Sequence, residues 1–396
     1  MDNLFIPIIY DLLLFLMVVI LYFCGKEMAK TGKIFSKAGV IAILTYTLNE
    51  GLRFGRGIDY NGYGRTYEIV ASGGTTNREL LFETFLRWFS NFGIPYQGII
   101  ILQSFMFIVA LLIFLLNFRE IFAYALPIFI IFSLYAFENL IRWYMGFSFI
   151  LCGMSLLIKG KPFYIYFLVS SIGCVFYIGI LPVILVFYLL FMQKKILLPP
   201  YISTSVYILI GLFFKTDIML FFAKYLDVLS FFSNRIEGYS ANAEQWLTSG
   251  ALGVSAGAFD SLFTFCYMFV VVWYGFKILN GKQSQYIFVY NLFIIGFMVK
   301  PLANQIELLQ RYDFLFCCFG AVVAALLLVN SISKKCLFRL RYLLFAVIIV
   351  FQLNYFRHPW INPSYQYMYV WDQKKHTYNY LHSLWIKDMY KKYKNN

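Results

Sequence analysis

The sequence contains little charge and almost no histidine. Charged residues make up 13% of its 396 residues, whereas a soluble domain usually carries about 25%. All three histidines, His358, His376 and His382, lie near the C-terminal end. A histidine-rich metal centre and a Ser-His-Asp triad are therefore excluded from the apolar part of the chain.

The cysteines and the acidic residues lack metal-ligand spacing. No two cysteines have the CxxC spacing and each lies in or beside an apolar run, so neither a disulfide framework nor a cysteine metal site is expected. The acidic residues form no DxD pair, so we expect no essential metal and no cofactor. The seven cysteines are Cys24, Cys152, Cys174, Cys266, Cys317, Cys318 and Cys336.

Long apolar runs are what the sequence does contain. Hydrophobic residues make up 61% of the chain, and the mean hydropathy is +0.71. The runs continue from Leu4 almost to Leu353 without a long polar linker, which predicts an all-α polytopic integral membrane protein of roughly 11–13 transmembrane helices. We expect residues 1–354 to form one transmembrane helical domain and residues 355–396 an aromatic and basic C-terminal tail.

Twelve of these runs could cross a membrane. The first has no basic residue before it and no small-residue cleavage site after it, so a retained helix is expected and not a cleaved signal peptide. The runs lie near residues 4–24, 38–52, 97–117, 121–138, 143–158, 162–178, 180–192, 201–214, 259–279, 285–300, 312–330 and 337–354.

Basic residues predict the orientation of these spans. With the N-terminus outside, the inside loops carry 15 basic and two acidic residues, a net of +13, and the remaining 18 basic and 17 acidic residues give +1. The formal charge of +14 thus reflects the positive-inside bias and not nucleic-acid binding. Twelve spans place the basic tail outside, whereas a further span over residues 218–233 would place it inside.

Polar residues collect in three segments expected on the outside, residues 50–95, 215–258 and 300–312. The first begins with a stretch that mixes arginine, acids, tyrosine and glycine. Arginine offers a planar fork for phosphate, glycine lets the backbone approach a ligand, and tyrosine can stack on a sugar. This composition suits a site for a phosphorylated sugar, although an exposed loop with internal ion pairs would share it. The candidate residues are Arg53, Arg56, Asp59, Tyr60 and Tyr63.

The other two outward segments supply further candidates for substrate binding. Residues 215–258 are polar and long for a membrane connector, which is typical of a lid or an acceptor-binding loop, or of a plain connector. In the third segment, a spacing of four places Glu307 and Arg311 on one helical face, where they can pair with each other or bind a ligand phosphate. The candidates are Arg235, Glu237, Tyr239, Glu307, Arg311 and Asp313.

Two stretches between these segments also carry charge beside apolar residues. Arg142 lies inside FENLIRWYMGFS, where a charge needs a partner or a function. Residues 78–91 have an amphipathic pattern and are expected along the outer interface, as a border of a lipid substrate's path or as a structural cap. Their apolar face is expected to carry Leu81, Phe85, Trp88 and Phe89.

Four short motifs resemble one known family. They read LRFGRGIDYNGY, NLIRWYMGFSF, RIEGYSA and QRYDF and follow one another between about Leu52 and Phe314. With these motifs the chain is similar to the Wzy/EpsG-type family of O-antigen and exopolysaccharide polymerases. The resemblance implies a fold similar to multi-span glycosyltransferases that use lipid-phosphate donors.

The resemblance also implies roles for single residues. Arg53, Arg56, Asp59 and Tyr60 correspond to the family's arginine and Asp-Tyr loop, and Arg142 corresponds to its inward-facing helix arginine. The family often has a Phe-His step after that arginine. This chain has Phe176-Tyr177 there, so a histidine base is not expected.

The implied activity is polymerisation of undecaprenyl-pyrophosphate-linked oligosaccharide repeats into O-antigen or a related surface polysaccharide, with release of undecaprenyl pyrophosphate. The site would face the periplasm from the bacterial inner membrane. Partners implied with it are membrane lipids, a chain-length regulator and a flippase of the same pathway, and no nucleic acid. We expect cations around the leaving group from Arg53, Arg56, Arg142 and Arg311, of which Arg56 and Arg142 are named as catalytic. Asp59 is expected to act as the base, with Glu50, Glu237 and Asp313 as alternative bases.

Two other functions remain open. A lipid-linked oligosaccharide flippase or transporter should have paired halves with matching broken helices, and no convincing repeat relates residues 1–195 to residues 200–396. An O-antigen ligase would carry out a related transfer onto a different acceptor.

Overall fold

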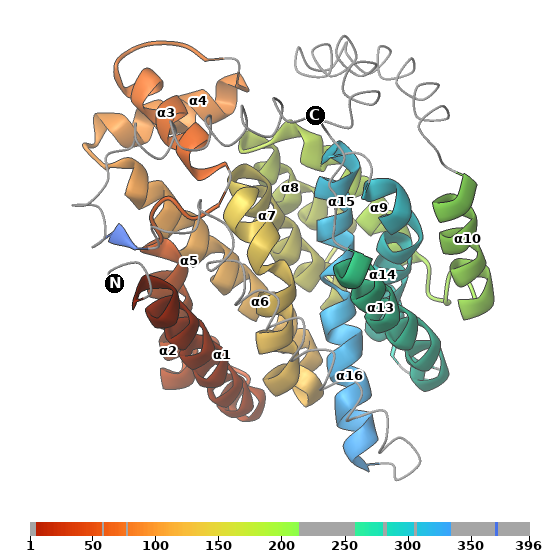
Figure 1. Ribbon diagram of the computed structural model, residues 1–396. Helices are drawn as coiled ribbons and strands as arrows, with labels where there is room; N and C mark the ends of the chain where they lie inside the picture. Colours follow the sequence, from red (N-terminus) through yellow and green to blue (C-terminus); the bar gives the residue numbers. More distant parts are fainter. Residues whose placement is uncertain are drawn as a thin grey trace. The chain divides into compact units, whose positions relative to one another are not determined.

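The computed structural model describes residues 5–57, 59–76, 78–213, 258–279, 283–304, 307–333 and 369–370. Every regular element in these ranges is a helix, apart from an isolated antiparallel bridge between Arg53 and Tyr369 (Figure 1). The contacts divide the chain into two compact units, residues 1–185 with 345–396 and residues 186–344. The single domain expected over residues 1–354 stays a prediction.

The first unit is a bundle of mostly apolar helices. In it α1 packs on α2 and α6, α2 on α5, α5 on α7, and α7 on α8. Gly146 and Gly173 let α7 approach its neighbour closely, because a Cβ on Gly146 would lie 2.9 Å from the carbonyl oxygen of Gly173. The helices are α1 (Phe5–Thr31), α2 (Lys37–Gly51), α3 (Tyr60–Ala71), α4 (Leu80–Asn91), α5 (Tyr96–Leu115), η1 (Leu116–Ile121), α6 (Phe122–Asn139), α7 (Ile141–Ile158), α8 (Phe163–Ser171), η2 (Ile172–Val175) and η3 (Ile178–Ile180).

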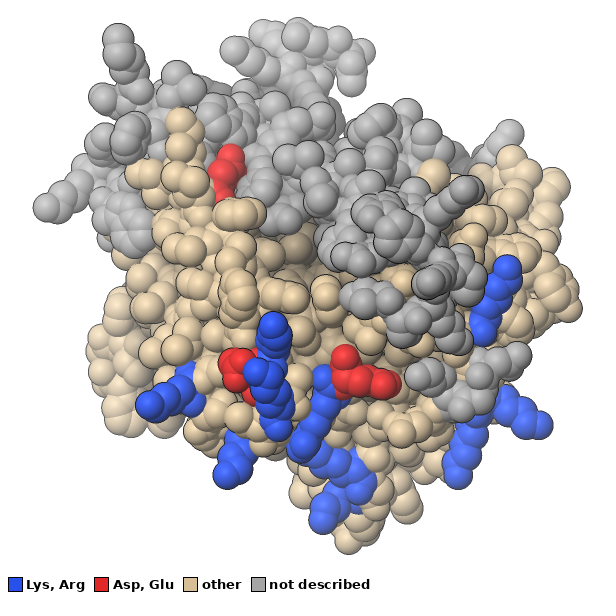
Figure 2. Space-filling view, turned by 90° about the horizontal axis from the view of Figure 1, so that it is seen from below, with Lys and Arg blue, Asp and Glu red and all other residues tan. Residues whose placement is uncertain are grey.

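The connectors after α1, α5 and α7 meet at one end of this unit, called the basic end below. Gly32 packs against the guanidinium of Arg119, and Asn117 Nδ2 donates to Ser155 Oγ at 2.8 Å. Figure 2 looks at a face where lysine and arginine side chains are frequent and acidic ones few. The exposed charged residues on these connectors and helix ends are Lys26, Glu27, Lys30, Lys33, Lys37, Arg119, Glu120, Lys159 and Lys161.

Helices α3 and α4 lie at the opposite end of the unit. Phe82, Leu86 and Phe89 of α4 are buried against residues of α3 and α5, because residues spaced by four and three share a helical face. Leu81 and Trp88 are exposed. Phe89, grouped with Leu81 and Trp88 from the sequence, therefore belongs to the packed side of the helix.

Within the described residues the second unit contains five further helices. Its α14 packs on α10, α13, α15 and α16, and α13 packs on α16. Helix α9 (Leu181–Met192) crosses the boundary between the two units. The helices of this unit are α10 (Pro200–Phe213), α13 (Ala258–Leu279), α14 (Ser284–Ala303), α15 (Glu307–Cys317) and α16 (Gly320–Ser333).

Length and composition make the chain a membrane protein. Five helical segments in the described ranges are long and apolar enough to cross a bilayer, and four shorter apolar helices accompany them. Eleven of the twelve apolar runs coincide with helices, and the twelfth, 337–354, lies outside the described residues. Large apolar side chains such as Leu12, Phe15 and Leu189 are exposed, as lipid-facing positions require. The predicted all-α polytopic membrane fold is confirmed.

Candidate functional site

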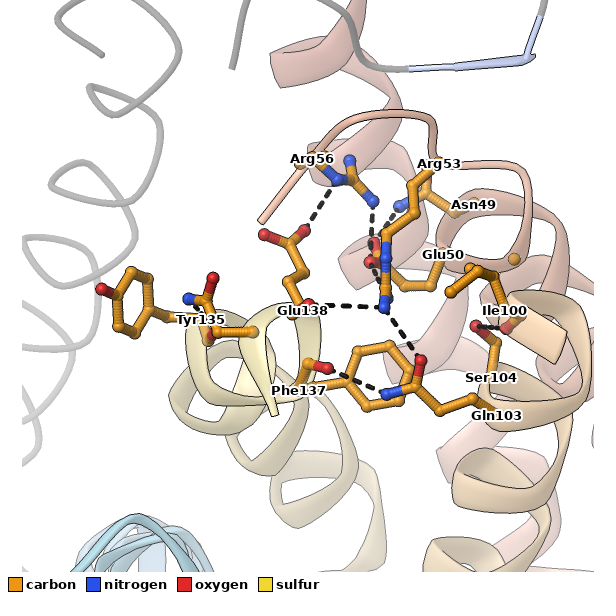
Figure 3. Close-up of polar contacts among 12 residues, drawn as sticks. Asn49, Glu50, Arg53, Arg56, Ile100, Gln103, Ser104, Tyr135, Phe137 and Glu138 are labelled. Carbon is orange, nitrogen blue, oxygen red and sulfur yellow. Dashed lines mark hydrogen bonds and ion pairs between the residues drawn. The ribbon is translucent and has the colours of Figure 1, made fainter. Parts of the chain in front are cut away.

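Two arginines and two glutamates form a buried cluster at the end of the first unit opposite the basic end (Figure 3). Glu50 lies in the last turn of α2, Glu138 lies in the last turn of α6, and Arg53 and Arg56 follow in the loop after α2. Arg56 Nη2 lies 2.7 Å from Glu50 Oε2, and Arg56 Nε lies 2.8 Å from Glu138 Oε1. All four side chains are 0% exposed. We call these four residues the charge cluster.

The position of the two carboxylates explains why the arginines are needed. Each glutamate lies at the C-terminal end of a helix, where the partial negative charge of the helix dipole disfavours another negative charge. Burial alone would lower the pKa of Arg56, but the carboxylates of Glu138 and Glu50 raise it well above its usual range. The guanidinium is therefore charged, and the formal charges of the four side chains sum to zero.

Arg53 is held by α5 and α6. Its Nη2 donates to Gln103 Oε1 at 2.9 Å and to the carbonyl oxygen of Glu138 at 3.5 Å, and its guanidinium lies 4.9 Å from the Phe137 ring centre. Gln103 in turn donates to the carbonyl oxygen of Phe137 at 2.9 Å. One polar side chain within the apolar α5 thus fixes both the arginine and the end of α6.

Gln97 and Gly57 hold the loop between α2 and α3 in place. Gln97 Nε2 donates to the carbonyl oxygens of Gly51 at 2.5 Å and Arg53 at 3.0 Å, and Tyr60 Oη donates to Gln97 Oε1 at 2.8 Å. Gly57 has a φ of +101°, and a Cβ there would lie 2.7 Å from the carbonyl oxygen of Glu138. Glycine is required at this position both for the backbone angle and for the close approach to α6.

Aromatic rings cover both arginines of the loop, and one ring comes from the C-terminal tail. The Arg56 guanidinium lies 4.8 Å from the ring centre of Tyr10 in α1 and 5.5 Å from that of Tyr369. Tyr369 Oη donates to Asn49 Oδ1 at 2.8 Å, and Val370 N donates to the Leu52 carbonyl oxygen at 3.0 Å. Part of the tail therefore belongs to the site.

A second group of side chains surrounds Arg142 in the first turn of α7. Its Nε donates to Tyr63 Oη at 3.0 Å, and it forms an ion pair with Glu79 at the start of α4. The rings of Phe82 and Tyr177 lie 5.2 and 5.0 Å from its guanidinium. Arg142 is 1% exposed, whereas the Glu79 side chain is 22% exposed. We call these five residues the Arg142 cluster.

The Arg142 cluster and the charge cluster share structural elements. Arg142 follows Glu138 across the break between α6 and α7 at Leu140. Tyr63 lies in α3, which begins directly after the loop of the charge cluster. Tyr177, which stands where the family resemblance has a histidine, contacts the arginine with its ring. Arg142 therefore lies at the same end of the first unit as the loop of Arg53 and Arg56, and their shared role in a site stays a prediction.

The second unit contains a separate ion pair. Lys300 Nζ lies 2.6 Å from Asp313 Oδ2, and Cys317 Sγ donates to Asp313 Oδ1 at 2.9 Å. Asp313 is buried and Arg311 is partly exposed, both on α15. Helix α15 begins at Glu307, but the side chain of Glu307 lies outside the described residues, so its pairing with Arg311 stays a prediction.

Not every residue predicted for the site can be placed. Arg235, Glu237 and Tyr239 lie outside the described residues. Asp59 is partly exposed at the N-cap of α3 and makes no capping hydrogen bond there. Four residues that contact the arginines of the two clusters were not predicted as site residues from the sequence: Gln103, Glu79, Tyr10 and Tyr369.

Of these four, only Gln103 has a signal in the sequence. It is a lone amide side chain in the apolar α5, and such a residue inside a membrane helix needs a partner. Tyr369 is one of three tyrosines in YQYMYV, and nothing local distinguishes it from the others.

The fold and the two clusters define a class of protein. Fully buried arginines and carboxylates at one end of a membrane helix bundle are typical of polytopic membrane proteins that act on charged substrates. Residues 36–370 match the EpsG family, and the chain belongs to that family. The family makes it a membrane polysaccharide polymerase of a glycosyltransferase-like kind. No curated protein and no solved structure matches the chain.

Proposed function

We propose that the chain joins undecaprenyl-pyrophosphate-linked oligosaccharide repeats into O-antigen or a related surface polysaccharide. The proposal rests on the family and on one observation, the concentration of buried arginines at the end of the first unit that is opposite its basic end. A pyrophosphate leaving group needs cations placed around it before the reaction, and ion pairs and hydrogen bonds hold these arginines in place.

Arg142 is the arginine best suited to contact the pyrophosphate. The charge cluster pairs two arginines with two glutamates, so it has no excess positive charge to offer an anion. Arg142 instead pairs with Glu79, whose side chain is partly exposed, and Arg78 lies 5.0 Å from the ring of the neighbouring Tyr63. A lipid pyrophosphate that displaced Glu79 would meet two arginines.

Asp59 is the proposed base. Glu50 and Glu138 are fully buried and bind the Arg56 guanidinium, so an acceptor hydroxyl does not reach their oxygens. Asp59 lies partly exposed at the start of α3, directly after the loop of the charge cluster. It would accept the proton of the acceptor hydroxyl.

The proposed reaction moves one glycosyl group from the lipid carrier to the acceptor. The acceptor hydroxyl oxygen bonds to the anomeric carbon of a second lipid-linked chain, while the bond from that carbon to the pyrophosphate oxygen breaks. Asp59 takes the hydroxyl proton, and undecaprenyl pyrophosphate leaves with the electron pair. Arg142 stabilises the charge that develops on the leaving phosphate, and Arg56 keeps the loop before Asp59 in place.

The basic end indicates on which side of the membrane the proposed site lies. Seven lysines and arginines and two acids lie on the connectors and helix ends of that end. Under the positive-inside rule this end faces the cytoplasm of a bacterial inner membrane. The two clusters would then face the periplasm, where lipid-linked repeats, a flippase and a chain-length regulator would meet the chain.

Alanine variants in cells test this function. Asp59→Ala and Arg142→Ala, each with protein levels matched to wild type, are expected to abolish long chains while single repeats still reach the surface. Long chains in both variants would show that the proposed site is wrong.

The same cells separate the two alternatives. Loss of every surface repeat on deletion would indicate a flippase. Polymer that accumulates on the undecaprenyl carrier would indicate a ligase.

A further inference from the structure

We propose that Tyr369 is a positioning residue of the site, which holds Arg56 in place through Asn49 and Glu50. This role rests on the proposed function. It is carried by three successive hydrogen bonds that link a tail residue to the guanidinium, and by backbone contacts that fix the tail residue itself.

The three bonds run through complementary groups. Tyr369 Oη donates to Asn49 Oδ1 at 2.8 Å, Asn49 Nδ2 donates to Glu50 Oε1 at 2.9 Å, and Glu50 Oε2 accepts from Arg56 Nη2 at 2.7 Å. Glu50 fixes the orientation of the amide, because only the Nδ2 group of Asn49 can donate to a carboxylate. The amide oxygen therefore faces Tyr369 and needs a donor.

The tyrosine hydroxyl meets that need. Burial raises the pKa of Tyr369 to about 12, although nearby Arg56 acts to lower it. The hydroxyl is therefore protonated near neutral pH and can donate. Its ring also lies over Arg56, so the same residue restrains the guanidinium from one face while Glu50 restrains its edge.

Backbone contacts hold Tyr369 against the loop. Tyr369 forms an antiparallel bridge with Arg53, and Val370 N donates to the carbonyl oxygen of Leu52. Tyr369 is 2% exposed, and Val370 packs against the apolar residues around α3 and α4. The Tyr369 side chain, far from the loop in the sequence, thus packs directly against the charge cluster.

A crosslink tests the contact without reference to activity. Leu52 and Val370 are opposite one another beside the bridge, where side chains of an antiparallel pair lie close together. The full-length double variant Leu52→Cys/Val370→Cys, oxidised in membranes, should give a peptide that joins the two positions in mass spectrometry. The two single variants are the controls. Absence of the joined peptide would overturn the proposal.

Kinetics test the positioning role. Tyr369→Phe keeps the ring and removes only the hydroxyl, so kcat for polymerisation of the lipid-linked repeat should fall about fivefold, the factor for one neutral hydrogen bond, while KM changes little. Tyr369→Ala should lower kcat further. Tyr164→Phe, which removes a hydroxyl from a tyrosine that is 61% exposed on α8, should match wild type.

The double variant Tyr369→Phe/Asn49→Ala tests whether Tyr369 acts through Asn49. The effects of Tyr369→Phe and Asn49→Ala on kcat should not multiply in the double variant, because both remove the same bond. Multiplying effects, or full kcat in Tyr369→Phe, would overturn the positioning role. Wild-type protein that makes no polymer from the lipid-linked repeat would instead overturn the proposed function, whatever the crosslink shows.

Discussion

Arg56 is restrained on every side by residues from four parts of the chain. Glu50 and Glu138 bind its edges, and Tyr10 and Tyr369 cover its faces. A buried charge that loses its partner is costly, so the energetic role of this arginine is first to neutralise two carboxylates inside the protein. Its contribution to chemistry depends on that structural role.

Replacement of Arg56 should therefore affect the amount of protein as well as its activity. Arg56→Ala leaves two buried carboxylates without this partner and should destabilise the first unit by about 3–5 kcal/mol. Lower protein levels in membranes and a lower unfolding temperature in detergent are the expected results. Arg65→Ala removes an exposed arginine from α3 and should leave both unchanged. Equal stability of the two variants would contradict the account of the charge cluster.

Arg142 should behave differently, because its carboxylate partner Glu79 is partly exposed. Arg142→Ala should lower kcat about 10²–10³-fold, as removal of one preorganised donor to developing charge does elsewhere. Arg142→Lys should recover part of the rate, since it keeps the charge and loses the planar fork. The measurement is polymer formation by purified protein at matched concentration, and a full rate in Arg142→Ala would contradict its proposed role.

At the scale of elements, the loop between α2 and α3 determines whether the clusters form. Gly57 has a positive φ, and its Cα faces the end of α6. Gly57→Ala should displace the loop from Glu138, lower protein stability by more than about 1 kcal/mol and reduce polymer length.

Gly62 in α3 is the matched control for that change. A Cβ on Gly62 would meet nothing within 4 Å, and alanine is the better helix former by about 1 kcal/mol. Gly62→Ala should therefore retain activity and be at least as stable as wild type in thermal unfolding. A larger loss in Gly62→Ala than in Gly57→Ala would show that the loop geometry is not limiting.

The helices and the arginines could be predicted from the sequence for different reasons. Apolar runs long enough to span a bilayer form helices almost regardless of context, because the membrane leaves few other ways to satisfy the backbone. Arg53, Arg56 and Arg142 were found because charge is rare in such a chain. Their partners were harder to predict, because the packing of the helices determines which side chain reaches a buried arginine.

Two contacts show why the partners of the arginines could not be predicted from the sequence. Gln103 lies 50 residues from Arg53, and Tyr369 lies 320 residues from Asn49. No periodicity or spacing links positions so far apart in the chain, and only the packed bundle brings them together. The sequence therefore singled out the arginines together with Glu50 and Tyr63, but not the distant partners Gln103 and Tyr369.

The positions of the basic end and of the two clusters predict which side of the membrane each faces. Cysteines introduced at Arg65 and at Lys161, both exposed, should react from opposite sides of the membrane. A membrane-impermeant maleimide should label Arg65→Cys in intact spheroplasts and Lys161→Cys only after permeabilisation. The unmodified chain gives the background from the exposed Cys266. The reverse pattern would place the two clusters in the cytoplasm.

The central claim is that the two clusters of the first unit form the active site of a polysaccharide polymerase. Its most direct test is polymer formation by the purified chain in proteoliposomes supplied with a lipid-linked repeat. Wild type and Arg65→Ala should make polymer, whereas Asp59→Asn and Arg142→Ala should be folded and make almost none. Polymer at the wild-type rate from either of the last two variants would contradict the claim.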